Sequence, residues 1–223
     1  MNTPPTLLRR LSRIVHLAVL AAACSAPPVP GGEIIEIFDG RSLAGWENKA
    51  FQGQTRYRLV QDGDRPALRA DSHAAASGLV RKIEIDLERT PYLNWSWRVE
   101  GTLGKLHERE KSGDDFAARV YVIVSGGLLF WRTKAINYVW ANTSPAGDAW
   151  PNPYTHRAHM VALESGAAHA GQWRSERRNV RDDFRRWFGE NVSHIHAVAL
   201  MTDTDDSAGQ ARAYYGPVYF SSE

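Results

Sequence analysis

The chain has 223 residues, of which 43% are hydrophobic and 23% charged, so a fibrous or largely disordered protein is excluded. This length suits one domain with a substantial core, or at most two small ones. Basic and acidic residues number 27 and 25. Loss of the first 23 residues would remove three arginines and no acid. The remainder is then near neutral, which argues against a nucleic-acid partner.

The N-terminus resembles an export signal. Arg9, Arg10 and Arg13 form a positive region, and the apolar stretch that follows, residues 14–23, is too short to span a membrane stably. We therefore expect residues 1–23 to be a signal peptide and residues 33–223 to form a single domain. Residues 24–32, rich in Pro, Ala and Gly, are expected to form a tether between the two.

Cys24 is the only cysteine of the chain. An exported protein with one thiol cannot form an internal disulfide. The run L-A-A-A-C resembles a bacterial lipobox, with Leu20 one place further upstream than usual, and predicts that Cys24 carries a lipid. A chance cysteine near the cleavage site is the alternative. Because Ser25 follows rather than Asp, the lipid-anchored protein is expected at the outer membrane, with the periplasm as the alternative location and the lipid as the sole membrane contact.

Residues 33–223 predict an all-β fold. Residues 56–60 and 67–70 flank Asp62-Gly63, a strong hairpin signal. Residues 93–99 alternate between apolar and polar with a period of two. Further strands are expected at 117–124, 136–141, 159–164, 195–201 and 213–220, and one helix at 180–188, between the capping residues Asn179 and Gly189. We predict an antiparallel β-sandwich of jelly-roll type, concanavalin-like or galactose-binding-like, with this helix at its periphery.

Three acids alternate with apolar residues in the run R-K-I-E-I-D-L-E-R. Glu84, Asp86 and Glu88 could be the catalytic acids of a sandwich glycosidase, or they could lie on the solvent-exposed face of an ordinary strand. Retaining glycosidases need two carboxyls roughly 5–5.5 Å apart, whereas residues i and i+4 of a strand are about 13 Å apart along it. We therefore interpret this stretch as a solvated strand face.

A more suggestive polar run is K-S-G-D-D-F, which leads into a strand carrying Arg119 and Tyr121. Alternation places Asp115, Arg119 and Tyr121 on one face and assigns Phe116, with Val120, to the core face. The polar residues could be an ion-pair network or the lining of a groove that binds a hydroxylated ligand. Asp114 and Asp115 precede this strand, and Asp203, Asp205 and Asp206 follow another one. If the two strands are antiparallel neighbours, the two acidic clusters meet at one end of the sandwich.

A calcium site at the second cluster is an alternative interpretation. Asp203 and Asp205 offer the oxygen ligands that a hard cation prefers. The helix-loop-helix calcium pattern fails, however, because Ala208 and Tyr214 occupy the positions that need Gly and Glu. A tight polar turn explains the same residues, and no cofactor is predicted.

Aromatic residues gather in a segment rich in Gly, Pro and Asn. Trp150 and Tyr154 could stack on the apolar faces of sugars or could pack within the protein. The sequence is compatible with both alternatives.

A series of motifs resembles one known family. They include T-P-Y-L-N-W-S-W-R-V, K-S-G-D-D-F-A-A-R-V-Y-V and W-x-x-E-R-R-N-V-x-x-D-F, followed by D-T-D-D-S and Y-Y-G. Together they are similar to the bacterial exported proteins called the domain of unknown function 3047 family. That family has no established activity but is similar to jelly-roll carbohydrate-binding sandwiches. The opening F-D-G-R-S-L-A-G-W also resembles sandwich domains described as keto-disaccharide hydrolases.

Together these features predict an exported, lipid-anchored sandwich that binds a carbohydrate or another cell-envelope polymer. The alternatives are a glycan-cleaving enzyme using Asp114, Asp115, Asp203 and Asp205, and a protein-interaction module in envelope assembly. An enzyme requires acids that converge on a groove, and an interaction module requires a broad apolar surface.

Overall fold

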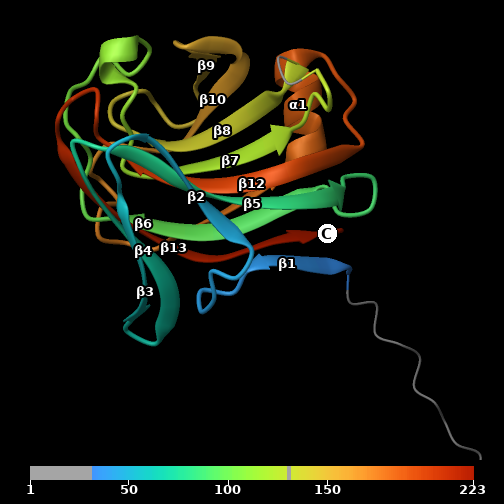
Figure 1. Cartoon of the computed structure of the whole chain (residues 1–223), viewed down its shortest axis with the longest axis horizontal. Coiled ribbons are helices and arrows are strands. Elements are labelled where there is room, and N and C mark those ends of the chain that lie inside the picture. The colour runs from blue at the N-terminus through green and yellow to red at the C-terminus, as the bar shows by residue number, and fades with distance from the viewer. Residues whose placement is uncertain (1–31, 130–131) are drawn as a thin grey trace, which may run out of the picture. The chain divides into compact units, whose positions relative to one another are not determined.

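The structure, a computed structural model, describes residues 32–129 and 132–223 (Figure 1). Gly32–Glu223 forms one compact unit. All the strands, the helix and the core described below lie in it, so this unit is expected to fold on its own. The predicted signal peptide, Cys24 and most of the predicted tether lie outside the described residues. Among the described helices, none has the length and apolar character needed to cross a bilayer.

Two β-sheets make up this unit. The six-stranded sheet has the order β11 (Arg174–Asn179), β6 (Tyr92–Val99), β13 (Gln210–Ser221), β4 (Arg65–His73) and β3 (Arg56–Asp62), and β1 (Ile34–Phe38) also pairs with β13. The seven-stranded sheet has the order β2 (Trp46–Gln52), β5 (Ala76–Asp86), β12 (His194–Asp203), β7 (Arg119–Val124), β8 (Lys134–Ala141), β10 (Thr155–Ser165) and β9 (Ala149–Asn152). The predicted all-β sandwich is confirmed. One pair, β8 with β10, is parallel.

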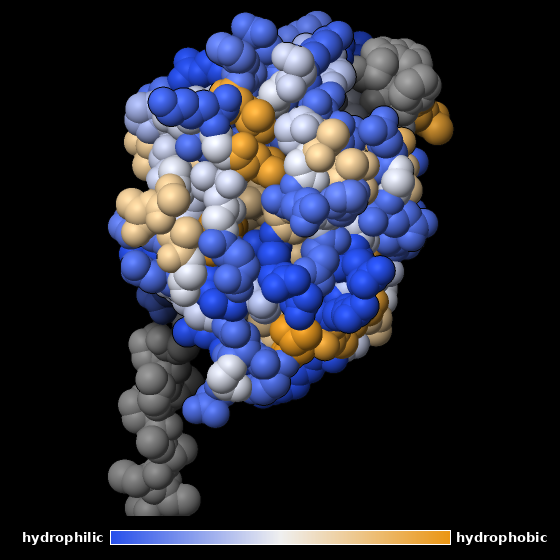
Figure 2. Space-filling model, turned by 90° about the vertical axis from the view of Figure 1, so that its left-hand side faces the viewer, coloured by the Kyte–Doolittle hydropathy of each residue, from blue (hydrophilic) through white to orange (hydrophobic). Residues whose placement is uncertain are grey.

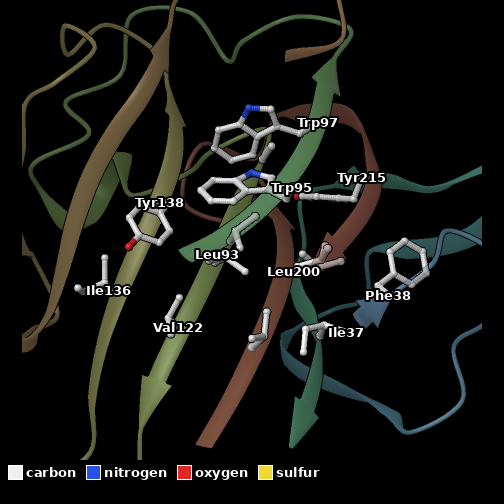
Figure 3. Packing of buried hydrophobic residues seen from close by; sticks show 14 of the residues in the cluster. Ile37, Phe38, Leu93, Trp95, Trp97, Val122, Ile136, Tyr138, Leu200 and Tyr215 are labelled. Atoms are coloured by element: carbon white, nitrogen blue, oxygen red, sulfur yellow. The ribbon is translucent and has the colours of Figure 1, made fainter. Parts of the chain in front are cut away.

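The core lies between the sheets and follows from the alternation along β6. Leu93, Trp95 and Trp97 are each at most 2% exposed. In Figure 3 they approach Tyr138 of β8, and the Trp95 and Tyr138 ring centroids are 5.3 Å apart. Burial of such large rings stabilises the sandwich. The polar residues between them on β6 therefore face away from the core.

The single α-helix, α1 (Val180–Phe188), begins and ends as predicted. The Asn179 side chain accepts a hydrogen bond from the Asp182 amide, and Gly189 ends the helix in a left-handed conformation. Val180 and Phe184 are fully buried against the sandwich core. In Figure 1, α1 lies at the opposite end of the strands from the short 3₁₀ helix η1 (Lys111–Gly113).

Candidate functional site

The two predicted acidic clusters meet at the end of the sandwich that carries η1. Strands β7 and β12 are antiparallel neighbours, and Arg119 lies directly opposite Met201. Asp114 and Asp115 precede β7, and Asp203 is the last residue of β12. The predicted convergence is therefore confirmed. Figure 2 shows this end of the molecule with a mostly hydrophilic surface and small, separate apolar areas.

Arg119 is the centre of the network. Its Nη2 lies 3.1 Å from Asp114 Oδ1, and its Nε lies 3.1 Å from Asp203 Oδ1. Nη1 donates to the Tyr121 hydroxyl at 2.9 Å, and Nη2 also donates to the main-chain carbonyl of Asp114. The guanidinium lies over the Phe116 ring, 4.5 Å from its centroid. Every side of the cation is thus occupied by the protein itself.

Burial governs the protonation of this network. It raises the pKa of Asp203 well above the ordinary value, and Arg119 only partly offsets that rise. Burial also raises the pKa of Asp114, and Arg119 again offsets part of that rise. Burial alone would lower the pKa of Arg119, but Asp114 and Asp203 together hold it well above its usual range. The arginine therefore stays charged and the two carboxyls share it.

Asp115 binds the main chain of the loop that follows β12. It is fully buried, and its two carboxylate oxygens accept hydrogen bonds from the Asp206 and Ser207 amides, at 3.2 and 2.6 Å. Its main-chain carbonyl accepts from the Asn142 side chain at 2.8 Å. These bonds fix the turn that precedes β13. Asp115 thus has the structural role that a buried carboxylate with amide partners commonly has.

One group of acids has the spacing of a cation site. Asp115, Asp205 and Asp206 each offer an oxygen, and these oxygens lie within 4.8 Å of one another. The Asp115 oxygens already accept amide hydrogens, however, and Asp203, one of the two predicted ligands, is paired with Arg119. The donor set therefore fits calcium poorly.

The predicted aromatic residues lie beside this network but differ in exposure. Trp150 is 4% exposed and packs against Phe116, with ring centroids 6.4 Å apart, so its environment favours the packing alternative. The prediction that Phe116 shares the core face of Val120 is wrong. Because β7 begins only at Arg119, the alternation does not extend back to Phe116, which joins a separate cluster with Trp150.

Tyr154 is the accessible member of the predicted set. It is 54% exposed, and its hydroxyl donates to the carboxylate of Asp206 at 2.9 Å. Partial burial and this hydrogen bond raise the pKa of Tyr154 to about 12. Tyr121, by contrast, is held by Arg119, and burial raises its pKa to about 12 as well.

The buried network around Arg119 offers few accessible groups to a ligand. Asp114, Asp115 and Asp203 are each at most 5% exposed. Their partners are protein groups, so a glycan has no access to them in this conformation. The acids of the run from Glu84 to Glu88 are also unsuited to catalysis. Glu84 lies on β5 and Glu88 in the turn after it, both are exposed, and Glu88 pairs with Arg181. The structure therefore gives no support to the glycan-cleaving alternative.

The outer face of the six-stranded sheet is different. Ser175 and Arg177 of β11 lie opposite Ser96 and Asn94 of β6, and Asn94 also lies opposite Tyr219 of β13. The intervening Trp95 and Trp97 belong to the core, so these five side chains share the outward side. Together with Arg65 they line a depression of about 440 Å³. Ligand sites typically have volumes of about 300–1,000 Å³.

Most polar groups around this depression have no hydrogen-bond partner in the described part of the chain. This holds for the hydroxyls of Ser96, Ser175 and Tyr219 and for the guanidiniums of Arg65 and Arg177. The amide nitrogen of Asn94 donates to Tyr92 and Ser221, but its carbonyl oxygen has no donor among these residues. Donors and acceptors gathered in a concave place without internal partners are free to bind a ligand.

Two more depressions lie along the same sheet. One, of about 510 Å³, is lined by Arg56, Asp71, His73, Gln210 and Arg212, among others. The other lies at the β3–β4 hairpin and is lined by Asp62, Asp64, Arg65 and Trp173. Arg65 belongs to both the hairpin depression and the one described above. The six-stranded sheet thus carries three depressions, two of which share Arg65.

Our sequence predictions missed this surface, although the alternation along β6 indicates part of it. The same alternation that identifies Trp95 and Trp97 as core residues assigns Asn94, Ser96 and Arg98 to the outside. The partner strand β11, residues 174–179, was not predicted. It supplies Ser175 and Arg177 to the depression.

Comparison with known proteins places the chain in a family. The model of the family described as "Protein of unknown function (DUF3047)" matches residues 44–219. No curated protein matches the sequence.

Among solved structures, the chain is similar to the xyloglucanase domain of NopAA from Sinorhizobium fredii, at a TM-score of 0.44 and 12% identity over 79% of this chain and 92% of that one. It is also similar to a family 29 carbohydrate binding module (TM-score 0.42, 11% identity, coverage 86% and 93%). A third similar structure is Trichoderma harzianum endoglucanase 3 (TM-score 0.43, 8% identity, coverage 87% and 99%). No function is inferred from similarities at this level.

Proposed function

The chain belongs to the DUF3047 family, and we propose that it is an exported, lipid-anchored β-sandwich that binds a carbohydrate or another cell-envelope polymer. The observation that carries this proposal is the depression between β11, β6 and β13. Its hydroxyl and guanidinium groups and the side-chain carbonyl oxygen of Asn94 have no hydrogen-bond partners among the described residues. A hydroxylated polymer offers both donors and acceptors to such groups. The neighbouring depressions would let several repeat units bind along the sheet.

The surface composition favours this function over a protein-interaction module. In the described residues, large exposed apolar side chains are few and come from separate segments: Ile34, Phe51, Leu59, Leu128 and Tyr154. A stable protein interface needs a more extended surface than isolated side chains provide.

Export and anchoring rest on the N-terminal sequence. The signal-like residues 1–23 and the lipobox-like run ending at Cys24 support a protein held at the periplasmic side of the outer membrane. A tether between anchor and sandwich would let the polar sheet face reach envelope polymers.

Substitutions of two tyrosines, Tyr219 and Tyr154, distinguish binding at the depression from binding at the acidic end of the sandwich. Gly32–Glu223 is tested by calorimetry against a panel of soluble glycans and solubilised envelope polymers. We expect Tyr219→Ala, which alters the depression, to weaken binding about tenfold, corresponding to about 1.4 kcal/mol. Tyr154→Ala, at the other candidate site, should leave affinity unchanged. No binding by the wild type, or loss of binding only in Tyr154→Ala, would contradict the proposal.

A further inference from the structure

Two arginines at the proposed polymer site form no ion pair among the described residues. Arg177 lies on β11 and Arg65 at the start of β4, with β6 and β13 between these strands. Both line the depression. Within residues 32–129 and 132–223, neither forms an ion pair. Two positive charges thus flank a floor of hydroxyl and amide groups.

Aromatic rings hold both guanidinium groups in place. The Arg177 guanidinium carbon is 3.7 Å from the centroid of the Tyr92 ring, and that of Arg65 is 4.7 Å from the Trp173 ring. Stacking of this kind fixes the plane of the guanidinium and leaves its N–H edge available. Such an edge matches the paired oxygens of a carboxylate or a phosphate.

Several other arginines of the same sheet form ion pairs. Arg69 and Arg212 both pair with Asp71, and Arg98 pairs with Asp62 and Glu100. Arg56 and Arg58 of β3 also form no ion pair among the described residues, but neither lines this depression.

One carboxyl, that of Glu176, also belongs to the residues that surround the depression. Because Glu176 lies opposite Trp95, its side chain is on the core side of β11, where it accepts a hydrogen bond from Trp97 Nε1 at 3.2 Å. It therefore does not neutralise the two stacked arginines.

We infer that this depression binds an anionic group of a glycan, the carboxylate of a uronic acid or the phosphate of a phosphorylated sugar, between Arg65 and Arg177. Asn94, Ser96 and Ser175 would bind the neighbouring hydroxyls. This inference rests on the proposed function and specifies its ligand class. The near-neutral charge of residues 33–223 makes a general attraction to polyanions weak, so selectivity must come from these two side chains.

The test compares three polymers on Gly32–Glu223 by calorimetry: neutral dextran, polygalacturonate as the carboxylate form and phosphomannan as the phosphate form. Arg65→Gln and Arg177→Gln should each weaken binding of the preferred anionic polymer about tenfold, or about 1.4 kcal/mol. Arg177→Lys should also weaken it, because lysine keeps the charge but loses the paired N–H edge. Arg186→Gln is the matched control. Arg186 is exposed and stacks on Trp187 at 4.5 Å, but it lies on α1.

The outcomes separate this inference from the proposed function. Tighter binding of either anionic polymer, lost in Arg65→Gln and Arg177→Gln but not in Arg186→Gln, supports it, and the preferred polymer identifies the anion. If neutral glycans bind through Tyr219 as tightly as anionic ones, the polymer function stands and the anionic site is wrong. Equal loss in Arg186→Gln would also overturn the site, since it indicates a general charge effect. If no polymer binds, both proposals fail. Thermal melting of each variant confirms that it is folded.

Discussion

Arg119 and Asp203 lie side by side where β7 and β12 meet, with Nε of the arginine 3.1 Å from Oδ1 of the aspartate, and both are buried. Asp114 contacts the same guanidinium from the segment before β7. The network therefore joins the start of β7 to the end of β12 at one end of the sandwich. The network stabilises this end of the sandwich. The polar groups that have no hydrogen-bond partner among the described residues lie instead on the outer face of the six-stranded sheet.

Removal of the central cation should be strongly destabilising. Arg119→Met leaves two buried carboxyls without a counter-charge, and we expect the free energy of unfolding to fall by about 3–5 kcal/mol. Adding Asp114→Asn and Asp203→Asn should restore much of the loss, because neutral amides need no cation. Glu84→Gln, on the exposed face of β5, is the control and should change stability by no more than about 0.5 kcal/mol. Urea denaturation measures all three, and wild-type stability of Arg119→Met would contradict a structural role.

Glu176 should make stability depend on pH near neutrality. Burial raises its pKa from an ordinary value of 4.5 to about 7, and the hydrogen bond from Trp97 offsets only part of this rise. Since the folded pKa exceeds the unfolded one, the folded state binds the proton more tightly. This contribution to stability is complete below about pH 4.5 and is lost as the pH rises to about 7.

The variant Glu176→Gln removes that titration and keeps an acceptor for Trp97. Its stability relative to the wild type should therefore increase between about pH 4.5 and 7 and then remain constant. Denaturation at several pH values measures the difference. Parallel curves for the two proteins across this range would show that Glu176 titrates normally.

Gly216 is required by the close approach of two strands in the sheet. A Cβ at this position would lie 2.2 Å from Ser96 Oγ. Gly216→Ala should therefore destabilise the protein by about 1–3 kcal/mol through overpacking. In the double variant with Ser96→Ala the clash disappears, and most of the loss should be recovered. Additive effects of the two substitutions would contradict this contact.

Calcium should have no effect on thermal stability. Asp203 is paired with Arg119, and the carboxylate of Asp115 accepts two amide hydrogens, so these oxygens are not free to bind the ion. A melting temperature that rises with calcium concentration would indicate a ligand that binds the folded state. The Asp205→Asn variant would then test whether the loop after β12 is the site.

The lipid anchor predicts a simple fractionation result. The mature wild-type protein should partition with membranes, and Cys24→Ala should release it into the periplasm. A soluble wild-type protein, cleaved at a position other than the one before Cys24, would contradict lipidation.

The fold was predictable where the local signals agree. Alternation along β6, the Asp62-Gly63 hairpin and the helix between Asn179 and Gly189 each combine a period with a suitable turn or cap residue, and the structure confirms all three. The convergence of Asp114 and Asp203 was also predictable, because two long apolar strands had acids at the ends that antiparallel pairing brings together.

What the sequence could not predict depends on pairing between distant segments. Strand β11 is polar along its length and shows no alternation, so neither its position beside β6 nor the depression between them has a local signal. The burial of Trp150 depends on a contact with Phe116, which lies far from it in the chain. Period and composition describe one strand at a time, whereas a binding surface is made by several.

Amide NMR of Gly32–Glu223, titrated with a fragment of the polymer it binds, tests most directly whether the outer face of the six-stranded sheet is the binding surface. We expect the largest shift changes at Asn94, Ser96, Ser175 and Arg177, with those of Asp205 and Asp206 unchanged. Shift changes centred on Tyr154, Asp205 and Asp206 would locate the ligand at the acidic end of the sandwich and contradict binding at the sheet face.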